Sequence, residues 1–199
     1  MVTHAPQRIG VLGGTFDPIH LGHLAAASEV HAVLGLDRVL VVPTAAQPFK
    51  ADHEAVSGEH RLAMAALSVA EDKRMEVSDV DVRRGAPTYT IDTLTDLARE
   101  YPESDWYFIT GADALARLDE WKDADKLREM ATFVGVTRPG YALPPGVHDV
   151  ALVEVPSLRV SSTDVRRRIR SGQPIRYLVP AVVADYIDEN HLYGGGLDD

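Results

Sequence analysis

The stretch RIGVLGGTFDPIHLGHLAAASEV, residues 8–30, determines how the rest of the chain is interpreted. The apolar run at 9–12 is typical of a short buried strand, and the glycine pair Gly13 and Gly14 interrupts it. From Leu21 onward, apolar residues recur at helical spacing. The stretch therefore predicts a strand, a tight turn and a helix in direct succession.

Two histidines, His20 and His23, fall in the first turns of the predicted helix. Unpaired backbone N–H groups and the positive end of the helix dipole lie there, and paired glycines let a ligand approach the backbone. Imidazole N–H groups can also donate to phosphate oxygens, so this H-x-G-H turn predicts a phosphate site. One alternative is that these are surface or capping histidines. Another is a metal site, although zinc-binding helices usually place two histidines at positions i and i+4 beside an acidic residue.

Two other phosphate-binding motifs are excluded by spacing. The glycines do not fit G-x-G-x-x-G, and no G-x-x-x-x-G-K-[ST] follows a predicted strand. The H-x-G-H turn therefore remains as the phosphate-binding candidate.

Composition limits the class of protein. The 199 residues are 45% hydrophobic, enough for one domain spanning 1–199. The absence of cysteine excludes disulfides and thiolate metal sites, and the sequence offers neither a targeting segment nor a run of eighteen apolar residues. We expect a cytoplasmic protein with no membrane partner.

Charge argues against a nucleic-acid partner. The net charge is −10, whereas nucleic-acid affinity comes largely from Lys and Arg that neutralise phosphates. A small anion responds to local charge instead, because screening limits distant charges to roughly 8 Å at physiological salt. Six of the twenty Lys and Arg lie in the segment 159–176, which forms a basic region in an acidic chain.

Apolar β-rich runs alternate with helical patterns along the chain. Strands are expected near 8–12, 38–42, 75–82, 106–110, 132–136 and 152–155, and helices near 21–34, 58–70, 90–101, 111–118 and 124–130. This order predicts an α/β fold: a single-domain, Rossmann-like, doubly wound parallel sheet with helices on both faces. Two terminal helices from about residue 161 should pack on the sheet, and 195–199 should be a frayed tail.

Ligands of such sheets bind beyond the carboxyl ends of the strands, so the loops there are of interest. Lys50 ends one of them and can reach a phosphate, although a lone loop lysine is often only a solvated charge. Gly111 follows a later strand and Asp113 opens a helix, where an acid commonly serves the helix dipole alone. Each residue is weak evidence taken singly.

A second predicted helix start lies in VSSTDVRRRIR, residues 160–170. Ser161 and Asp164 have capping spacing, and the sequence offers Ser hydroxyls with Arg166 behind them. A capped amphipathic helix with a solvated basic face is the alternative. We expect this turn and the glycine turn to face each other across a shared cleft.

Together these segments resemble the bacterial nicotinate-nucleotide adenylyltransferase family of the HxGH nucleotidyltransferase superfamily, over nearly the whole chain. The resemblance rests on GGTFDPIHLGHL, PFK, PTYTIDTL, TGADAL followed by Trp121, VTRPGY, VSSTDVR and YLVPAVVADYI. PTYTIDTL and the Trp121 motif indicate the nicotinate enzyme in particular. The family often has PHK where this chain has Pro48, Phe49 and Lys50, which removes one imidazole.

The resemblance implies a role for each matched residue. The catalytic residues it implies are His20, His23, Lys50 and Arg166, and the ATP-binding residues are Gly13, Gly14, Thr15, Phe16, Arg138, Ser161 and Ser162. Nicotinate mononucleotide would contact Tyr89, Thr90, Gly111, Asp113 and Trp121, with Trp121 stacked on the pyridine ring. Simple core packing is the alternative for Trp121.

The resemblance also implies a reaction in which AMP passes from ATP to nicotinate mononucleotide, giving nicotinate adenine dinucleotide and pyrophosphate in NAD biosynthesis. Mg²⁺ would bind with ATP, and no metal site built from protein ligands alone is expected. The alternatives are an adenylyltransferase for nicotinamide mononucleotide or phosphopantetheine, and a nucleotide-binding regulator without catalysis. The retained His20, Gly22 and His23 argue against the regulator.

Overall fold

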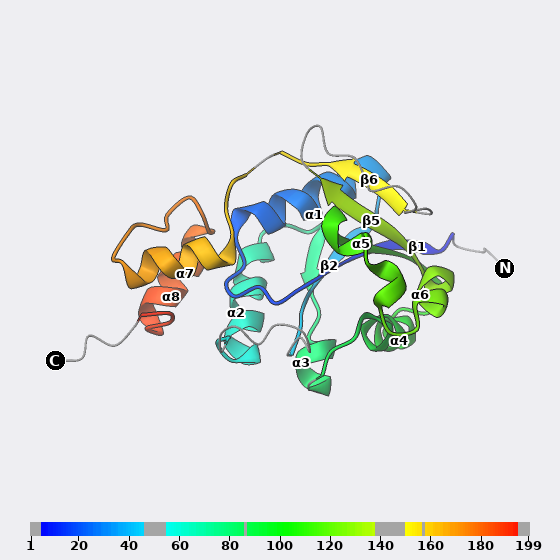
Figure 1. The fold of residues 1–199 in the computed structure, drawn as a ribbon, viewed down its shortest axis with the longest axis horizontal. Coiled ribbons are helices and arrows are strands. Elements are labelled where there is room, and N and C mark those ends of the chain that lie inside the picture. The colour runs from blue at the N-terminus through cyan, green and yellow to red at the C-terminus, as the bar shows by residue number, and fades with distance from the viewer. Residues whose placement is uncertain (1–4, 46–54, 86, 138–149, 157, 195–199) are drawn as a thin grey trace.

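The computed structural model describes residues 5–45, 55–85, 87–137, 150–156 and 158–194. This part of the chain forms a six-stranded, entirely parallel sheet in the order β3-β2-β1-β4-β5-β6 (Figure 1). The strands are β1 (Gln7–Gly14), β2 (Arg38–Pro43), β3 (Met75–Val77), β4 (Ser104–Gly111), β5 (Ala131–Thr137) and β6 (Val150–Glu154). The predicted doubly wound α/β fold is therefore confirmed.

Helices cover both faces of the sheet. One core includes residues of α1 (Leu21–Leu34), α2 (Gly58–Val69), α7 (Ser162–Arg170) and α8 (Ala181–Glu189). The other includes residues of α3 (Val80–Arg84), α4 (Thr90–Glu100), α5 (Ala112–Leu115), the 3₁₀ turn η1 (Leu118–Glu120) and α6 (Ala124–Met130). Strand β2 serves both, because Val39 and Val41 lie in the first core and Leu40 and Val42 in the second.

The C-terminal helices α7 and α8 lie together at one end of the molecule, beside α2 and the loop that follows β1 (Figure 1). Their buried residues Val165, Val183 and Ile187 belong to the same core as the α1 and α2 residues. The Tyr186 hydroxyl also lies 2.9 Å from Nδ1 of His60 on α2. The predicted tail at 195–199 lies outside the described residues.

Two element predictions are wrong in detail. The strand expected over 75–82 ends at Val77, and α3 begins at Val80. Asp81 is buried and pairs with Arg84 three residues later, a spacing that a helix brings together and a strand does not. The helix expected over 111–118 is α5, only four residues long, followed by η1.

The neighbours β1 and β4 mark the switch point of the sheet, because the chain proceeds from β1 to β2 and β3 on one side and from β4 to β5 and β6 on the other. In this topology the crevice at the carboxyl ends of the two central strands is the usual ligand site. The loops that begin at Gly14 and Gly111 flank it. Among the described helices, none is long and apolar enough to cross a membrane.

Candidate active site

The loop between β1 and α1 is shaped by aromatic rings that pack on its glycines. Phe16 has a positive φ of 50°, and its ring covers Gly14, where an added Cβ would lie 2.8 Å from the ring. A Cβ on Gly13 would lie 3.3 Å from the ring of Phe108. The space beside both glycines is thus filled by protein, so their absent side chains serve the packing of this loop.

The two histidines form a stacked pair at the start of α1. The rings of His20 and His23 lie 3.6 Å apart at an angle of 15°, and Phe16 packs edge-on against His23 at 4.9 Å. The His20 backbone N–H donates to Nδ1 of His23 over 3.2 Å. A Cβ on Gly22 would lie 3.1 Å from the His20 ring and 3.2 Å from Val160, so the glycine of H-x-G-H leaves room for the imidazole.

His20 is only 7% exposed, and this burial lowers its pKa to about 4. The imidazole is therefore neutral at physiological pH, with one N–H to donate. Nδ1 of His20 and Oγ1 of Thr15 are buried and have no hydrogen-bond partner among the described residues. Buried polar atoms are normally paired, so these two atoms indicate a place where a bound group completes the site.

The serine-arginine turn contacts this loop directly. Ser162 donates from its hydroxyl to the Pro18 carbonyl over 2.8 Å, and Arg166 donates from Nη1 to the Asp17 carbonyl over 2.6 Å. Ser161 caps α7, with its hydroxyl accepting from the Asp164 N–H. The structure thus brings the two predicted turns to the same place, although they are about 140 residues apart in sequence.

Some groups expected to be available to a ligand are engaged by the protein itself. The Leu21 N–H, in the first turn of α1, donates to the Leu178 carbonyl over 3.0 Å. Arg166 is 9% exposed and its described bonds go to the Asp17 carbonyl and Thr163. Its predicted part in holding phosphate stays a prediction, whereas its hold on the loop is observed.

The predicted pyridine-binding residues gather on the other face of the sheet. Trp121 is partly buried and packs edge-to-face against Phe108 and Phe133, each at 5.9 Å. The next residue, Lys122, lies 4.6 Å from the Tyr89 ring centre and 3.3 Å from Oδ2 of Asp92 in α4. Lys122 therefore ties the Trp121 segment to the start of α4, where Tyr89 and Thr90 lie.

The remaining predicted residues divide into two groups. Gly111 ends β4 with open space beside its Cα, and Asp113 is exposed in the first turn of α5. Both lie at the crevice edge of the sheet. Lys50 and Arg138 lie outside the described residues.

A buried arginine that the sequence analysis missed connects the two halves of the site. Arg61 on α2 is 2% exposed and donates from Nη1 to the carbonyls of Thr15, over 2.8 Å, and Thr44, over 2.6 Å. The next residue, Ala45, donates its N–H to Thr88 just before α4. The detectable signal was a charged residue in the apolar stripe of α2, since Arg61 shares its buried face with Met64.

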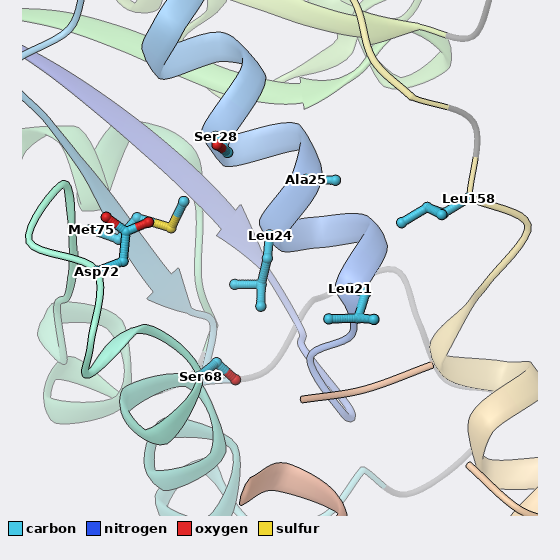
Figure 2. A pocket seen from close by; sticks show the side chains of 8 residues that line it. All are labelled: Leu21, Leu24, Ala25, Ser28, Ser68, Asp72, Met75 and Leu158. Carbon is cyan, nitrogen blue, oxygen red and sulfur yellow. The ribbon is translucent and has the colours of Figure 1, made fainter. Parts of the chain in front are cut away.

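A pocket of about 380 Å³ lies on another side of α1 and contains none of the predicted site residues (Figure 2). It is lined by Leu21, Leu24, Ala25, Ser28, Ser68, Asp72, Met75 and Leu158. Its mainly apolar lining offers no cationic group to a phosphate. Within the described ranges, no group of three or more His, Cys, Asp or Glu could hold a metal ion.

The fold and the site together define a doubly wound α/β protein that carries an H-x-G-H turn at the switch point of its sheet. A family model described as cytidylyltransferase-like matches residues 11–168. The chain belongs to this family and, within it, to the nicotinate-nucleotide adenylyltransferases, because relatives that carry this name are more than 50% identical over most of its length.

Two relatives and one solved structure illustrate the likeness. Two of them are named "probable nicotinate-nucleotide adenylyltransferase". The protein from Saccharopolyspora erythraea is 52% identical over 95% of this chain and 91% of its own length. The protein from Paenarthrobacter aurescens is 55% identical over 92% of this chain and 89% of its own length. The Plasmodium falciparum nicotinic acid mononucleotide adenylyltransferase complexed with NaAD superposes with a TM-score of 0.77, covering 94% of this chain and 97% of that one. At 20% identity, that structure supports the fold alone.

Proposed function

We propose that this protein is a cytoplasmic adenylyltransferase that joins nicotinate mononucleotide to the AMP part of ATP, releasing pyrophosphate. The observation that carries the proposal is the stacked His20–His23 pair, which follows β1 at the switch point of the sheet, after the loop that the α7 turn contacts at Pro18. The names of the relatives, at more than 50% identity, support the same reaction. The loop of β1 would hold the triphosphate, with Lys50 and Arg138 contributing charge.

The chemistry needs alignment more than proton transfer. A phosphate monoester has its second pKa near 6, so the mononucleotide phosphate is already ionised at neutral pH and can attack the α-phosphorus of ATP in line. The bond to the α-phosphorus forms as the bond to pyrophosphate breaks, and negative charge grows on the leaving group. Fixed donors aimed at that charge would account for the rate, and no general base is required.

The neutral state of His20 suits a donor in this role. Its N–H can bond a phosphate oxygen while the low pKa keeps the ring from exchanging a proton near neutral pH. His23 would donate beside it, because the two rings are stacked. Both histidines are therefore proposed as hydrogen-bond donors to ATP.

Local charge beneath the loop favours an anion in spite of the acidic chain. Two buried guanidinium groups, Arg61 and Arg166, lie close to one buried carboxylate, Asp17. Among the buried charged groups described here, two positive charges therefore face one negative charge below Thr15 and Phe16. Buried charges are screened much less than exposed ones, so this excess acts on a bound triphosphate.

Mg²⁺ would arrive with the nucleotide as part of the substrate. Since no described cluster of carboxylates or histidines could ligate it, phosphate oxygens and water would supply its ligands, which suits its preference for retaining water. Asp113, exposed at the start of α5, would accept from one of those waters or from a ribose hydroxyl.

Recognition of the pyridine ring would fall to the Trp121 and Tyr89 side of the crevice. Trp121 is held by Phe108 and Phe133 yet remains partly exposed, which suits a stacking surface. Backbone N–H groups near Tyr89 and Thr90 would receive the carboxylate. The amide of nicotinamide mononucleotide would instead direct its NH₂ group at these backbone N–H donors. Each buried polar group left unpaired in this way costs about 1 to 3 kcal/mol.

The test is pyrophosphate release with ATP, Mg²⁺ and one of three acceptors: nicotinate mononucleotide, nicotinamide mononucleotide or phosphopantetheine. We expect release with the nicotinate compound and at least tenfold less with its amide, roughly the effect of one unpaired group. A preference for phosphopantetheine, or no release with any acceptor, would refute the proposal. The Trp121→Ala variant should raise KM for the mononucleotide and leave KM for ATP unchanged.

A further inference from the structure

Asp17 lies under the candidate phosphate loop and is only 2% exposed. Its Oδ1 accepts from the Tyr193 hydroxyl over 2.7 Å and from the Val56 N–H over 3.4 Å, and its Oδ2 lies 3.6 Å from Nη1 of Arg166. The Tyr193 bond is the shortest of the three and joins residues 176 positions apart. A residue beyond α8 is thus bonded directly to the loop that carries the histidines.

The backbone around Asp17 is held from below on both sides of Phe16. Arg61 donates to the Thr15 carbonyl over 2.8 Å, and Arg166 donates to the Asp17 carbonyl over 2.6 Å. Phe16 between them has the left-handed φ of 50°, which a bulky residue adopts only where its surroundings fix it. Fixing the Asp17 side chain through Tyr193 adds to this constraint.

A displacement of this backbone would reach the histidines through direct contacts. The Phe16 ring packs edge-on against His23 at 4.9 Å, and His23 stacks on His20 at 3.6 Å. Closely packed groups transmit small shifts, since no free space absorbs them. The orientation of both imidazoles therefore depends on where Phe16 and Asp17 sit.

Tyr193 is suited to a permanent donor role. Burial, reinforced by the nearby Asp17 carboxylate, raises the pKa of its hydroxyl above the ordinary value. The O–H therefore stays protonated through the physiological range. Hydrogen bonds from a hydroxyl to a carboxylate are among the stronger kinds in proteins.

We propose that Tyr193 is a positioning residue for the transfer reaction, holding Asp17 so that Phe16, His23 and His20 keep the arrangement that the transition state requires. This role rests on the proposed function. It differs from a purely structural role, in which the bond would stabilise the fold and leave the site unaffected.

The experiment compares Tyr193→Phe with the matched control Tyr186→Phe. Each variant removes one hydroxyl, and the Tyr186 hydroxyl lies 2.9 Å from Nδ1 of His60, joining α8 to α2 with no described bond to the loop. We expect Tyr193→Phe to lower kcat about tenfold with KM for nicotinate mononucleotide within about twofold, because misplaced catalytic groups reduce turnover more than binding. Tyr186→Phe should keep kcat within about twofold, even if its melting temperature falls as far as that of Tyr193→Phe.

A second readout needs no activity. In histidine-labelled protein, the imidazole NMR signals of His20 and His23 should shift in Tyr193→Phe and stay in place in Tyr186→Phe. If the wild-type protein releases no pyrophosphate, the proposed function fails while these shifts still test the positioning role. Unchanged kcat and unchanged signals in Tyr193→Phe would overturn the inference, as would equal losses of kcat in both variants.

Asp17→Ala provides a further check at the other end of the same bond, because it removes the oxygen that accepts from the Tyr193 hydroxyl. If Tyr193 acts through Asp17, adding Tyr193→Phe to Asp17→Ala should lower kcat much less than it does in the wild-type protein. Independent, multiplying effects would show that Tyr193 does not act through Asp17. The single variant at Asp17 removes the same bond from its other end, so its kcat tests the inference if Tyr193→Phe fails to fold.

Discussion

Because His20 is buried and neutral, we can predict how strongly the free energy of unfolding depends on pH. Its pKa in the folded protein is about 4, against 6.5 for the free side chain, because burial disfavours the charged ring. The unfolded chain therefore binds a proton at this site between those two values, whereas the folded chain does not. The contribution of His20 to the free energy of unfolding is therefore fully present above pH 6.5 and is lost as the pH falls toward 4.

The size of this loss follows from the two pKa values. One pKa unit corresponds to about 1.4 kcal/mol, so the full difference is worth about 3 kcal/mol. About 2 kcal/mol of this should disappear between roughly pH 7 and pH 5. For a domain of ordinary stability, that is a substantial part of the free energy of unfolding.

The assay is urea unfolding at a series of pH values for three proteins: the wild type, His20→Gln and His191→Gln. Glutamine does not titrate, so the His20 variant should lack the loss of about 2 kcal/mol. His191→Gln, at an exposed position, controls for the substitution itself. The free energy difference between wild type and His20→Gln should therefore change with pH. A difference that stays constant from pH 7 to pH 5 would refute a neutral, buried His20.

Three further predictions concern the loop and its supports. Gly22→Ala places a Cβ 3.1 Å from the His20 ring and 3.2 Å from Val160, so pyrophosphate release should fall at least about tenfold with the fold retained by circular dichroism; an active variant would contradict this reasoning. Arg61→Met leaves four loop carbonyls without their donor and should cost about 3 to 5 kcal/mol in urea unfolding, whereas less than 1 kcal/mol would show that the bonds are replaceable. Ser161→Ala removes the α7 cap and should lower the melting temperature in line with about 1 kcal/mol; an unchanged melting temperature would mean that water caps the helix equally well.

The elements that the sequence predicted well are those with a strong local pattern. The strand, glycine turn and helix of residues 8–30 needed only apolar spacing and a glycine pair, and they appear as β1 and α1. The strand predicted over 75–82 was wrong in its second half, because the valines there also suit a strand, whereas the buried Asp81 pairs with Arg84 three residues further on in α3. Short segments of this kind are decided by tertiary pairing, which no local pattern contains.

The candidate site shows the same division. His20, His23, Ser162 and Arg166 could be named as candidates because they lie in or near the first turns of predicted helices with a distinctive composition. Arg61 was missed, since in sequence it is one charge within a helix, and only the folded chain places it beneath the loops that follow β1 and β2.

The sequence by itself determined the alternation of strands and helices and the H-x-G-H turn, because these depend on interactions between near neighbours. Only the tertiary structure decided that His20 is buried and neutral, that the glycines accommodate aromatic rings, and that Tyr193 bonds Asp17. The physical reason is that burial, charge pairing and close packing are properties of groups far apart along the chain. They exist only once the sheet has brought those groups together.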